Sequence, residues 1–255
     1  MSNVRHWPEY LMESVGLGLF MVAATVGASL LEHPAFGGPA ALPDPLLRRA
    51  LMGLAMGLTA IGIIYSPMGR RSGAHLNPAV TLTFWRLGKI GSCDAAAYAL
   101  FQLGGGLLGT LAGAFALWPW AGTQSLDIVT TRPGPAGPGP AFVAEAAISF
   151  LLMLVVLTLS STPRFEGFTG LAAGALVAGF IAFEAPLSGM SMNPARTLAS
   201  AIPAATFDAL WVYALAPPLG MLAAAETFLR FRRDPRPFCA KLRHTRPCIF
   251  CETAR

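Results

Sequence analysis

An eleven-residue phrase occurs twice in this chain, 116 positions apart. Residues 72–82 read SGAHLNPAVTL and residues 188–198 read SGMSMNPARTL, with seven of the eleven positions identical. Asparagine is a favoured helix N-cap, and proline is best tolerated at the next position, the first of the helix. Each Asn-Pro-Ala, namely Asn77-Pro78-Ala79 and Asn193-Pro194-Ala195, therefore predicts the start of a short helix. We expect these helices to end near Arg86 and near Ala201.

Composition places these short helices in a membrane. Apolar residues make up 54% of the chain and charged residues 12%, whereas a soluble domain carries about 25% charged residues. Six long apolar runs predict membrane spans at about 10–31, 48–68, 94–117, 141–160, 168–187 and 208–230. One Asn-Pro-Ala segment follows the second span and the other follows the fifth. A ten-residue helix is about 15 Å long, half of a hydrocarbon core of about 30 Å, so these helices span half of the membrane.

The two repeats are predicted to have opposite orientations in the membrane. Each holds three full spans, and an odd number sends the second repeat in from the other side. The repeats, about 8–130 and 141–230, form one channel-like domain over residues 1–230, followed by a basic tail at 231–255. A Pro/Gly-rich run at 131–141 joins them, and we expect it to be a surface linker without regular structure.

The distribution of basic residues predicts that both termini are cytoplasmic. With that orientation, fourteen of the eighteen Lys and Arg residues lie inside and three lie outside, while Arg196 lies within a half-spanning helix. The sequence start has no charged region leading into a cleavable apolar segment, so no signal peptide is expected. The sequence therefore predicts a multi-pass protein of the plasma (inner) membrane.

Six spans, inverted repeats and paired boxes in AHLNPAVT and SMNPARTL resemble the aquaporin and aquaglyceroporin, or major intrinsic protein, family over about residues 8–232. The resemblance implies an all-α membrane fold of six transmembrane helices and two re-entrant half-helices. It also implies a homotetramer with one pore per subunit and no cofactor. Its partners would be lipid, water and small neutral solutes of the glycerol, urea or metalloid-acid type, and not nucleic acid. No nucleophile–base set, HExxH or phosphate loop suggests an enzyme.

The predicted pore lies where the half-helices meet. Each helix N-terminus is equivalent to roughly half a positive charge, which repels cations and protons. Asn77 and Asn193 would offer N–H donors there. The stretches 73–76 and 189–192 would expose carbonyls, because irregular backbone is tolerated at membrane depth where it lines a cavity.

The resemblance also implies a selectivity ring of four side chains. Its members would be Met56, with Gly57 as the alternative, then Ile181, Met190 and Arg196. Strict water channels carry an aromatic residue and a His at the first two positions, so this amphipathic ring is more similar to glycerol-type and plant nodulin-like members. Glycerol facilitators, however, typically have an Asp and a basic residue where this chain has Thr197 and Ala201. A strict water channel therefore remains an alternative.

Glu13 and Glu145 occupy equivalent positions near the starts of the first and fourth spans. A buried carboxylate is costly unless it is hydrogen-bonded. The resemblance implies that these acids accept N–H groups from the loops before the half-helices. The alternative is a proton relay, which would indicate a coupled secondary transporter. We expect His75 to line the cytoplasmic vestibule or to brace the first loop.

The tail carries cysteine and histidine at ligand-like spacing, C-x4-H-x3-C-x2-C. These residues, Cys239, His244, Cys248 and Cys251, are of types that bind zinc. A basic tail that contacts anionic lipid is the alternative interpretation.

Overall fold

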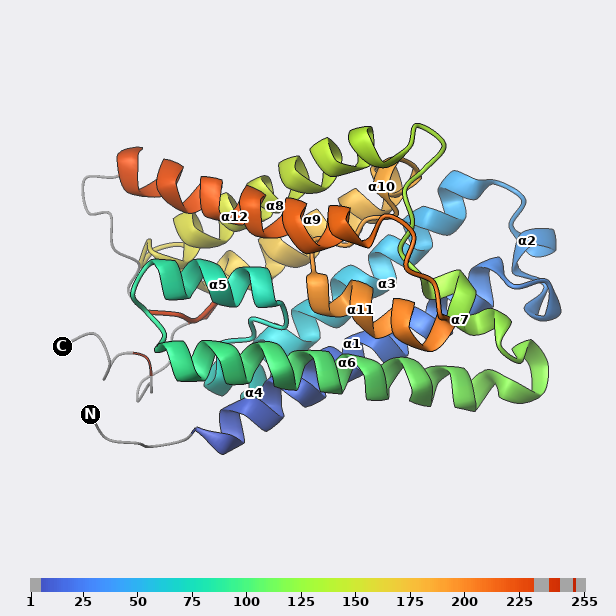
Figure 1. Ribbon diagram of the computed structural model, residues 1–255, viewed down its shortest axis with the longest axis horizontal. Coiled ribbons are helices and arrows are strands. Elements are labelled where there is room, and N and C mark those ends of the chain that lie inside the picture. The colour runs from blue at the N-terminus through green and yellow to red at the C-terminus, as the bar shows by residue number, and fades with distance from the viewer. Residues whose placement is uncertain (1–5, 232–238, 244–249, 251–255) are drawn as a thin grey trace.

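The computed structural model describes residues 6–231, 239–243 and 250, and the regular structure of this part is helical (Figure 1). Six of its helical segments are long and apolar enough to cross a membrane. They are α1 (Trp7–Glu32), α3 (Pro45–Tyr65), α6 (Ser92–Ala121), α8 (Pro138–Ser160), α9 (Thr169–Phe183, preceded by the 3-10 turn Glu166–Phe168) and α12 (Leu210–Phe231). The prediction of six spans is confirmed.

Two short helices begin at the repeated boxes. They are α5 (Pro78–Arg86) and α11 (Pro194–Ala204), so the second runs three residues beyond the expected Ala201. Each follows a still shorter helix, α4 (Pro67–Ser72) or α10 (Ala185–Ser188). Three further short elements, the 3-10 turn Pro34–Phe36, α2 (Gly38–Ala41) and α7 (Gln124–Val129), complete the set in the described residues.

The second and fifth spans end earlier than the sequence predicted. Helix α3 stops at Tyr65, because Ser66 is extended before Pro67 and its side chain caps α4 through the Gly69 N–H at 3.0 Å. Helix α9 stops at Phe183, and α10 follows with Pro186 in its first turn. The chain thus breaks twice before each half-helix, and apolarity alone does not reveal the first break.

The predicted surface linker is only partly what the sequence suggested. Residues 138–141 already belong to α8, because proline is well tolerated in a first helical turn. The Gly134 N–H donates to the Leu187 carbonyl at 2.9 Å, and a Cβ on Gly134 would lie 1.9 Å from the Pro186 carbonyl oxygen. The linker is therefore packed against α10.

Glycines let the long helices touch at their backbones. A Cβ on Gly105 of α6 would lie 2.0 Å from the Ser14 carbonyl oxygen of α1, and one on Gly53 of α3 would lie 2.4 Å from the Ala178 carbonyl oxygen of α9. Such approach is the usual basis of helix association in lipid, where apolar side chains gain little from leaving the hydrocarbon. The bundle is closed by these small-residue contacts.

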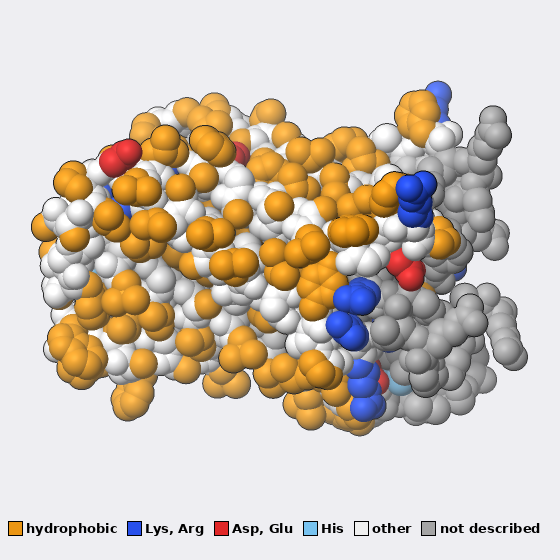
Figure 2. Space-filling view, turned by 180° about the vertical axis from the view of Figure 1, so that it is seen from behind, with side chains coloured by type: hydrophobic (Ala, Val, Ile, Leu, Met, Phe, Trp, Pro, Cys, Tyr) orange, Lys and Arg blue, Asp and Glu red, His pale blue; other side chains and the backbone are white. Residues whose placement is uncertain are grey.

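The outer face of the bundle is apolar. Large side chains on α6, including Leu100, Leu108 and Phe115, are 69–80% exposed. Figure 2 shows hydrophobic side chains over most of one face, with Lys and Arg gathered towards one end. We call this end, where α1 begins and α12 ends, the near end, and the opposite end, where α2 lies, the far end (Figure 1).

Candidate functional site

A cavity of about 280 Å³ runs between the helices and both half-helix loops. Its lining includes Glu32 and Arg49, at the end of α1 and in the second turn of α3, and Ala74 and His75, which follow α4. In Figure 1, α1 ends and α3 begins towards the far end, and α4 lies towards the near end. Seven of the predicted site residues line it: Met56, His75, Asn77, Ile181, Met190, Asn193 and Arg196. Pro78, Ala79, Pro194 and Ala195 form the first turns of the two half-helices beside it.

Each box asparagine caps its half-helix. The Asn77 Oδ1 accepts from the Ala79 N–H at 2.8 Å. The Asn193 Oδ1 accepts from the N–H groups of Ala195 and Arg196 at 3.0 and 3.2 Å. Both asparagines have extended backbones, which an N-cap requires. The side-chain oxygen is thus used locally, and the amide nitrogen remains for other partners.

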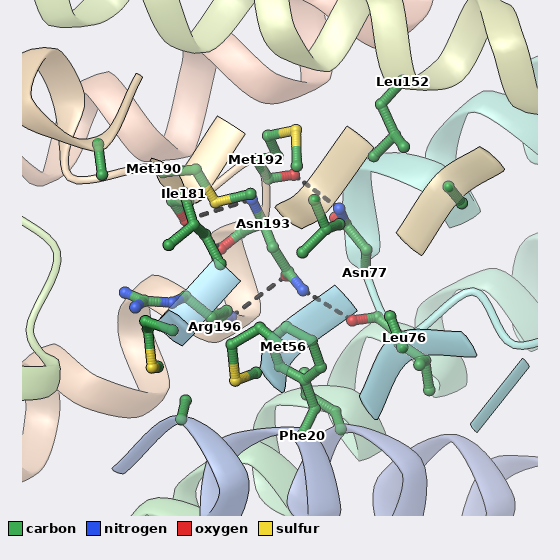
Figure 3. A pocket seen from close by; sticks show the side chains of 18 of the residues that line it. Phe20, Met56, Leu76, Asn77, Leu152, Ile181, Met190, Met192, Asn193 and Arg196 are labelled. Atoms are coloured by element: carbon green, nitrogen blue, oxygen red, sulfur yellow. Dashed lines mark hydrogen bonds between the residues drawn. The ribbon is translucent and has the colours of Figure 1, made fainter. Parts of the chain in front are cut away.

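The two repeats exchange hydrogen bonds through these amide nitrogens. Asn77 Nδ2 donates to the Met192 carbonyl at 2.6 Å, and Asn193 Nδ2 donates to the Leu76 carbonyl at 2.7 Å (Figure 3). An amide NH₂ has two donors, so each asparagine, which also lines the cavity, has one N–H beyond this bond. The sequence predicted donors in the pore, but it gave no sign of this exchange.

The loops before the boxes have an unusual backbone that is the same in both repeats. Ala74 and Leu76 have φ values of 53° and 51°, and the equivalent Met190 and Met192 have values of 48° and 53°. An L-residue in this left-handed region costs roughly 1–2 kcal/mol. Each loop therefore contains two strained residues. Other parts of the chain must compensate for this strain.

Two buried carboxylates supply that support. Glu13 accepts from the N–H groups of His75 and Leu76 at 3.1 and 2.6 Å. Glu145 accepts from those of Ser191 and Met192 at 2.6 and 2.7 Å. Both side chains are fully buried, and neither lines the cavity. Hydrogen bonds to a charged acceptor are stronger than neutral ones, so each carboxylate fixes one loop.

Three further polar residues support the same loops, two of them directly and Gln102 through Glu13, and were not predicted. The hydroxyl of Tyr98 donates to the Ser72 carbonyl at 2.7 Å, and that of Tyr213 donates to the Ser188 carbonyl at 2.5 Å. Gln102 Nε2 donates to Glu13 at 2.8 Å. The tyrosines follow their serines by 26 and 25 residues. An alignment of the repeats extended beyond the boxes, with a gap of one residue, would have paired them.

The four residues of the predicted ring line one cavity. Met56 comes from α3, Ile181 from α9, Met190 from the second loop and Arg196 from α11 (Figure 3). Gly57, the alternative to Met56, packs instead against α9, where its Cβ would lie 2.5 Å from the Gly174 carbonyl oxygen.

Arg196 and Phe20 give this stretch of the cavity its chemical character. The Arg196 Nη1 atom is buried and has no hydrogen-bond partner among the described residues. Phe20 of α1 also points into the cavity (Figure 3) and was not predicted. The ring therefore has one cationic donor among apolar side chains, and its aromatic residue comes from the first span.

His75 connects the first loop to the tail. Its Nδ1 is 3.0 Å from the Thr81 hydroxyl, and its Nε2 is 2.7 Å from the Ala240 carbonyl, to which it donates. Of the predicted zinc ligands, Cys239 is described and buried, while His244, Cys248 and Cys251 lie outside the described residues. The described part of the chain contains no group of three or more side chains that could hold a metal.

Comparison with known proteins agrees with this architecture. Residues 1–228 match the family model described as Major intrinsic protein. The chain is 33% identical over 236 residues to Aquaporin NIP2-1 of Oryza sativa subsp. japonica, covering 90% of this chain and 74% of the relative. It is 36% identical over 181 residues to Probable aquaporin AqpM of Archaeoglobus fulgidus, covering 68% and 73%.

A solved structure has the same fold. The X-ray structure of the aquaglyceroporin from Plasmodium falciparum superposes with a TM-score of 0.69 at 21% identity, covering 88% of this chain and 96% of that one. At this level of identity the likeness shows the fold alone. The family match over residues 1–228 and the identity to the two relatives show that the chain belongs to the major intrinsic protein family.

Proposed function

We propose that this protein is a passive membrane channel for water and small neutral solutes that excludes ions and protons. The family consists of membrane channels and not of enzymes. The observation that carries the proposal is the cavity in which the two half-helix N-termini meet, joined by the bonds of Asn77 and Asn193 to the opposite loops. A neutral solute can exchange its water hydrogen bonds for the free amide N–H groups and loop carbonyls there.

The charges around the cavity support exclusion of cations. Two helix N-termini, each equivalent to roughly half a positive charge, point to its centre, and the Arg196 guanidinium adds a full charge. Glu13 and Glu145 are absent from the described lining and are bound to backbone N–H groups. A proton relay would need a series of acids along the pore, whereas Glu32, the one acid in the described lining, is paired with Arg48 at 3.0 Å. This arrangement disfavours the alternative of a coupled secondary transporter.

The ring supports solutes larger than water. Met56, Ile181 and Met190 are flexible or aliphatic, and Phe20 adds an aromatic face, while Arg196 alone donates. A solute with an apolar side and several oxygen or nitrogen acceptors fits such a ring, because methionine adapts its shape. Glycerol-like, urea-like and metalloid-acid solutes have this character. A strict water channel is the second candidate, favoured by the absence of the Asp and basic residue noted at Thr197 and Ala201.

We also propose the setting of the channel. The excess of basic residues and their grouping near one end (Figure 2) support a plasma, or inner, membrane location with the near end in the cytoplasm. The exposed apolar side chains of α6 and neighbouring helices support contact with lipid and with copies of the chain in a homotetramer.

Stopped-flow light scattering of proteoliposomes tests the proposed activity. Shrinkage under an impermeant osmolyte reports water flux, and reswelling in glycerol or urea reports solute flux. We expect both rates to exceed those of protein-free vesicles. Met56→Trp, which fills the ring, should lower both. Leu58→Trp is the matched control, since Leu58 lies on the outward face of α3 and is 58% exposed. Rates equal to those of empty vesicles would contradict the proposal.

A further inference from the structure

The tail returns to the near end of the cavity. Residues 239–242 and Phe250 are each 6% exposed or less, although the tail lies beyond the last membrane helix. Among them is the charged residue Lys241, which is only 3% exposed. A charged residue is almost never fully buried on a free surface segment. The described tail residues are therefore docked on the bundle.

Two hydrogen bonds, one between backbones and one from the His75 side chain, hold this segment on the first half-helix loop. The Leu242 N–H donates to the Gly73 carbonyl at 3.2 Å, and the His75 Nε2 donates to the Ala240 carbonyl at 2.7 Å. The fit is close, because a Cβ on Gly73 would lie 2.7 Å from the Ala240 carbonyl oxygen. The tail thus uses polar groups of the loop that a solute leaving the pore would otherwise meet.

Aromatic contacts extend the docking surface. The Phe250 ring stacks on the His75 ring with centroids 6.0 Å apart and packs edge-on against Tyr98 at 6.1 Å. The Arg243 guanidinium lies 5.0 Å from the centre of the Tyr65 ring. These contacts join the tail to α3, α6 and the first half-helix loop. These elements surround the near mouth, which is the opening of the cavity at the near end.

Leu242 lines the same cavity as the box asparagines and Arg196. From these contacts we infer that residues 239–243 and Phe250 form an autoinhibitory plug, which closes the near mouth when docked and opens it when released. The inference rests on the proposed channel function. The aliphatic side chain of Leu242 offers a solute no hydrogen bond in the mouth, and the His75 Nε2 is already bonded to Ala240. The contacts are non-covalent, so release of the plug would break no covalent bond.

At the far mouth, the cavity opening at the far end, the second loop is also covered by a packed segment, which suggests that such a segment could be a permanent lining and not a plug. There the linker packs on the second loop, and a Cβ on Gly189 would lie 2.7 Å from the Arg132 carbonyl oxygen, much as Gly73 meets Ala240. Val129, just before the linker, lines the cavity. If the tail were likewise a permanent lining, its release would leave flux unchanged or lower it. A plug predicts an increase.

The decisive variant is the full-length chain with Leu242→Pro and Phe250→Ala. Proline removes the N–H that bonds to Gly73, and alanine removes the ring from His75. Phe231→Ala is the matched control, because it removes a ring of the same kind from the end of α12, where Phe231 is 79% exposed. We expect the double variant to raise water flux per protein in stopped-flow measurements by roughly tenfold, as when a state populated at about 10% becomes dominant. The control should keep the parent rate. A double variant at or below a measurable parent rate would overturn the plug.

Thiol labelling tests docking independently of flux. In a Cys248→Ser/Cys251→Ser background two cysteines remain, Cys93, which is exposed, and Cys239, which is buried. With Cys93 as internal reference, Cys239 should react slowly in this background and at least several times faster once Leu242→Pro and Phe250→Ala are added. Equal labelling in both would overturn docking. Faster labelling with no flux in any form would instead contradict the channel function and leave the docked tail standing.

Discussion

Buried carboxylates decide the geometry of the pore loops at the scale of single residues. Four non-glycine residues, Ala74, Leu76, Met190 and Met192, are held at positive φ. Each costs roughly 1–2 kcal/mol. A hydrogen bond to a charged group contributes about 1.5–3 kcal/mol, and each carboxylate accepts two from loop N–H groups. The strain and its compensation are thus of the same order, so loss of either carboxylate should release its loop.

Replacement of Glu145 by Gln tests this compensation. The Gln amide would turn an N–H towards a loop N–H and leave it without an acceptor. We expect a loss of about 2–3 kcal/mol in unfolding free energy, the cost of a buried unsatisfied donor. Thermal unfolding in detergent measures it. Glu226→Gln is the control, since the Glu226 side chain is 54% exposed and pairs with the similarly exposed Arg86. Equal stability of both variants would contradict a supporting role for Glu145.

Selectivity is also decided by single residues. Met56→Phe with Ile181→His should narrow the ring and add a polar group. We expect the glycerol-to-water flux ratio to fall by roughly tenfold, as for a pocket contact of about 1–3 kcal/mol. Stopped-flow reswelling measures the ratio, with Leu54→Phe on the exposed face of α3 as control. An unchanged ratio would mean that the selective constriction lies elsewhere in the cavity.

Sequence analysis identified the site residues that occur in both repeats. It missed a residue that faces the cavity only because of how its helix is rotated. Asn77, Asn193, Glu13 and Glu145 stand at equivalent positions of the two repeats, so one copy supports the other. Phe20 was not identified by such a comparison of the repeats. Whether a side chain of an almost wholly apolar helix faces lipid or the pore depends on the rotation of that helix in the bundle, which hydropathy does not specify.

At the scale of helices, close backbone packing replaces the hydrophobic effect. Gly105 of α6 touches the Ser14 carbonyl of α1, whereas its neighbour Gly104 has open space around it. Gly105→Ala should therefore separate the helices and cost about 2–3 kcal/mol in unfolding free energy. Gly104→Ala should be neutral or stabilise by up to about 1 kcal/mol, because alanine is the better helix former. Thermal unfolding of the two variants measures the difference in stability. An equal effect of both changes would contradict the role of close backbone packing at Gly105.

Helix starts were predictable and helix ends were less so. An Asn-Pro pair acts locally, so α5 and α11 begin where the sequence indicated. The ends of α3 and α9 fall inside continuous apolar runs, at Ser66 before Pro67 and at Glu184 before α10. Neither break changes the average apolarity of the run. The first break is visible when Pro67 is considered with the residue before it, and the second falls at Glu184, two residues before Pro186.

Zinc binding by the tail stays a prediction. If Cys239, His244, Cys248 and Cys251 hold one zinc ion, purified protein should contain about one equivalent, because four such ligands complete a structural site. Mass spectrometry of the metal content, compared with Cys248→Ser/Cys251→Ser, measures it. Equal, near-zero zinc in both proteins would favour the lipid-contacting tail.

The whole molecule combines an inverted repeat with two different ends. The boxes, carboxylates and tyrosines obey the internal two-fold relation, and each loop is held by equivalent contacts. The segments packed on the two loops differ, with the inter-repeat linker at one mouth and the tail at the other. The sequence predicted the symmetric part because it is duplicated. It could not place the tail, whose contacts depend on the assembled mouth.

The central claim is that solutes pass down their own gradient without coupling to protons. The most direct measurement follows radiolabelled glycerol in proteoliposomes that start with equal glycerol on both sides and a pH difference across the membrane, with an internal pH dye. It should be made with the parent chain and with the Leu242→Pro/Phe250→Ala variant. The account predicts that labelled glycerol equilibrates faster than in protein-free vesicles without net accumulation, while the pH difference decays as in those vesicles. Accumulation of glycerol driven by the pH difference would contradict it.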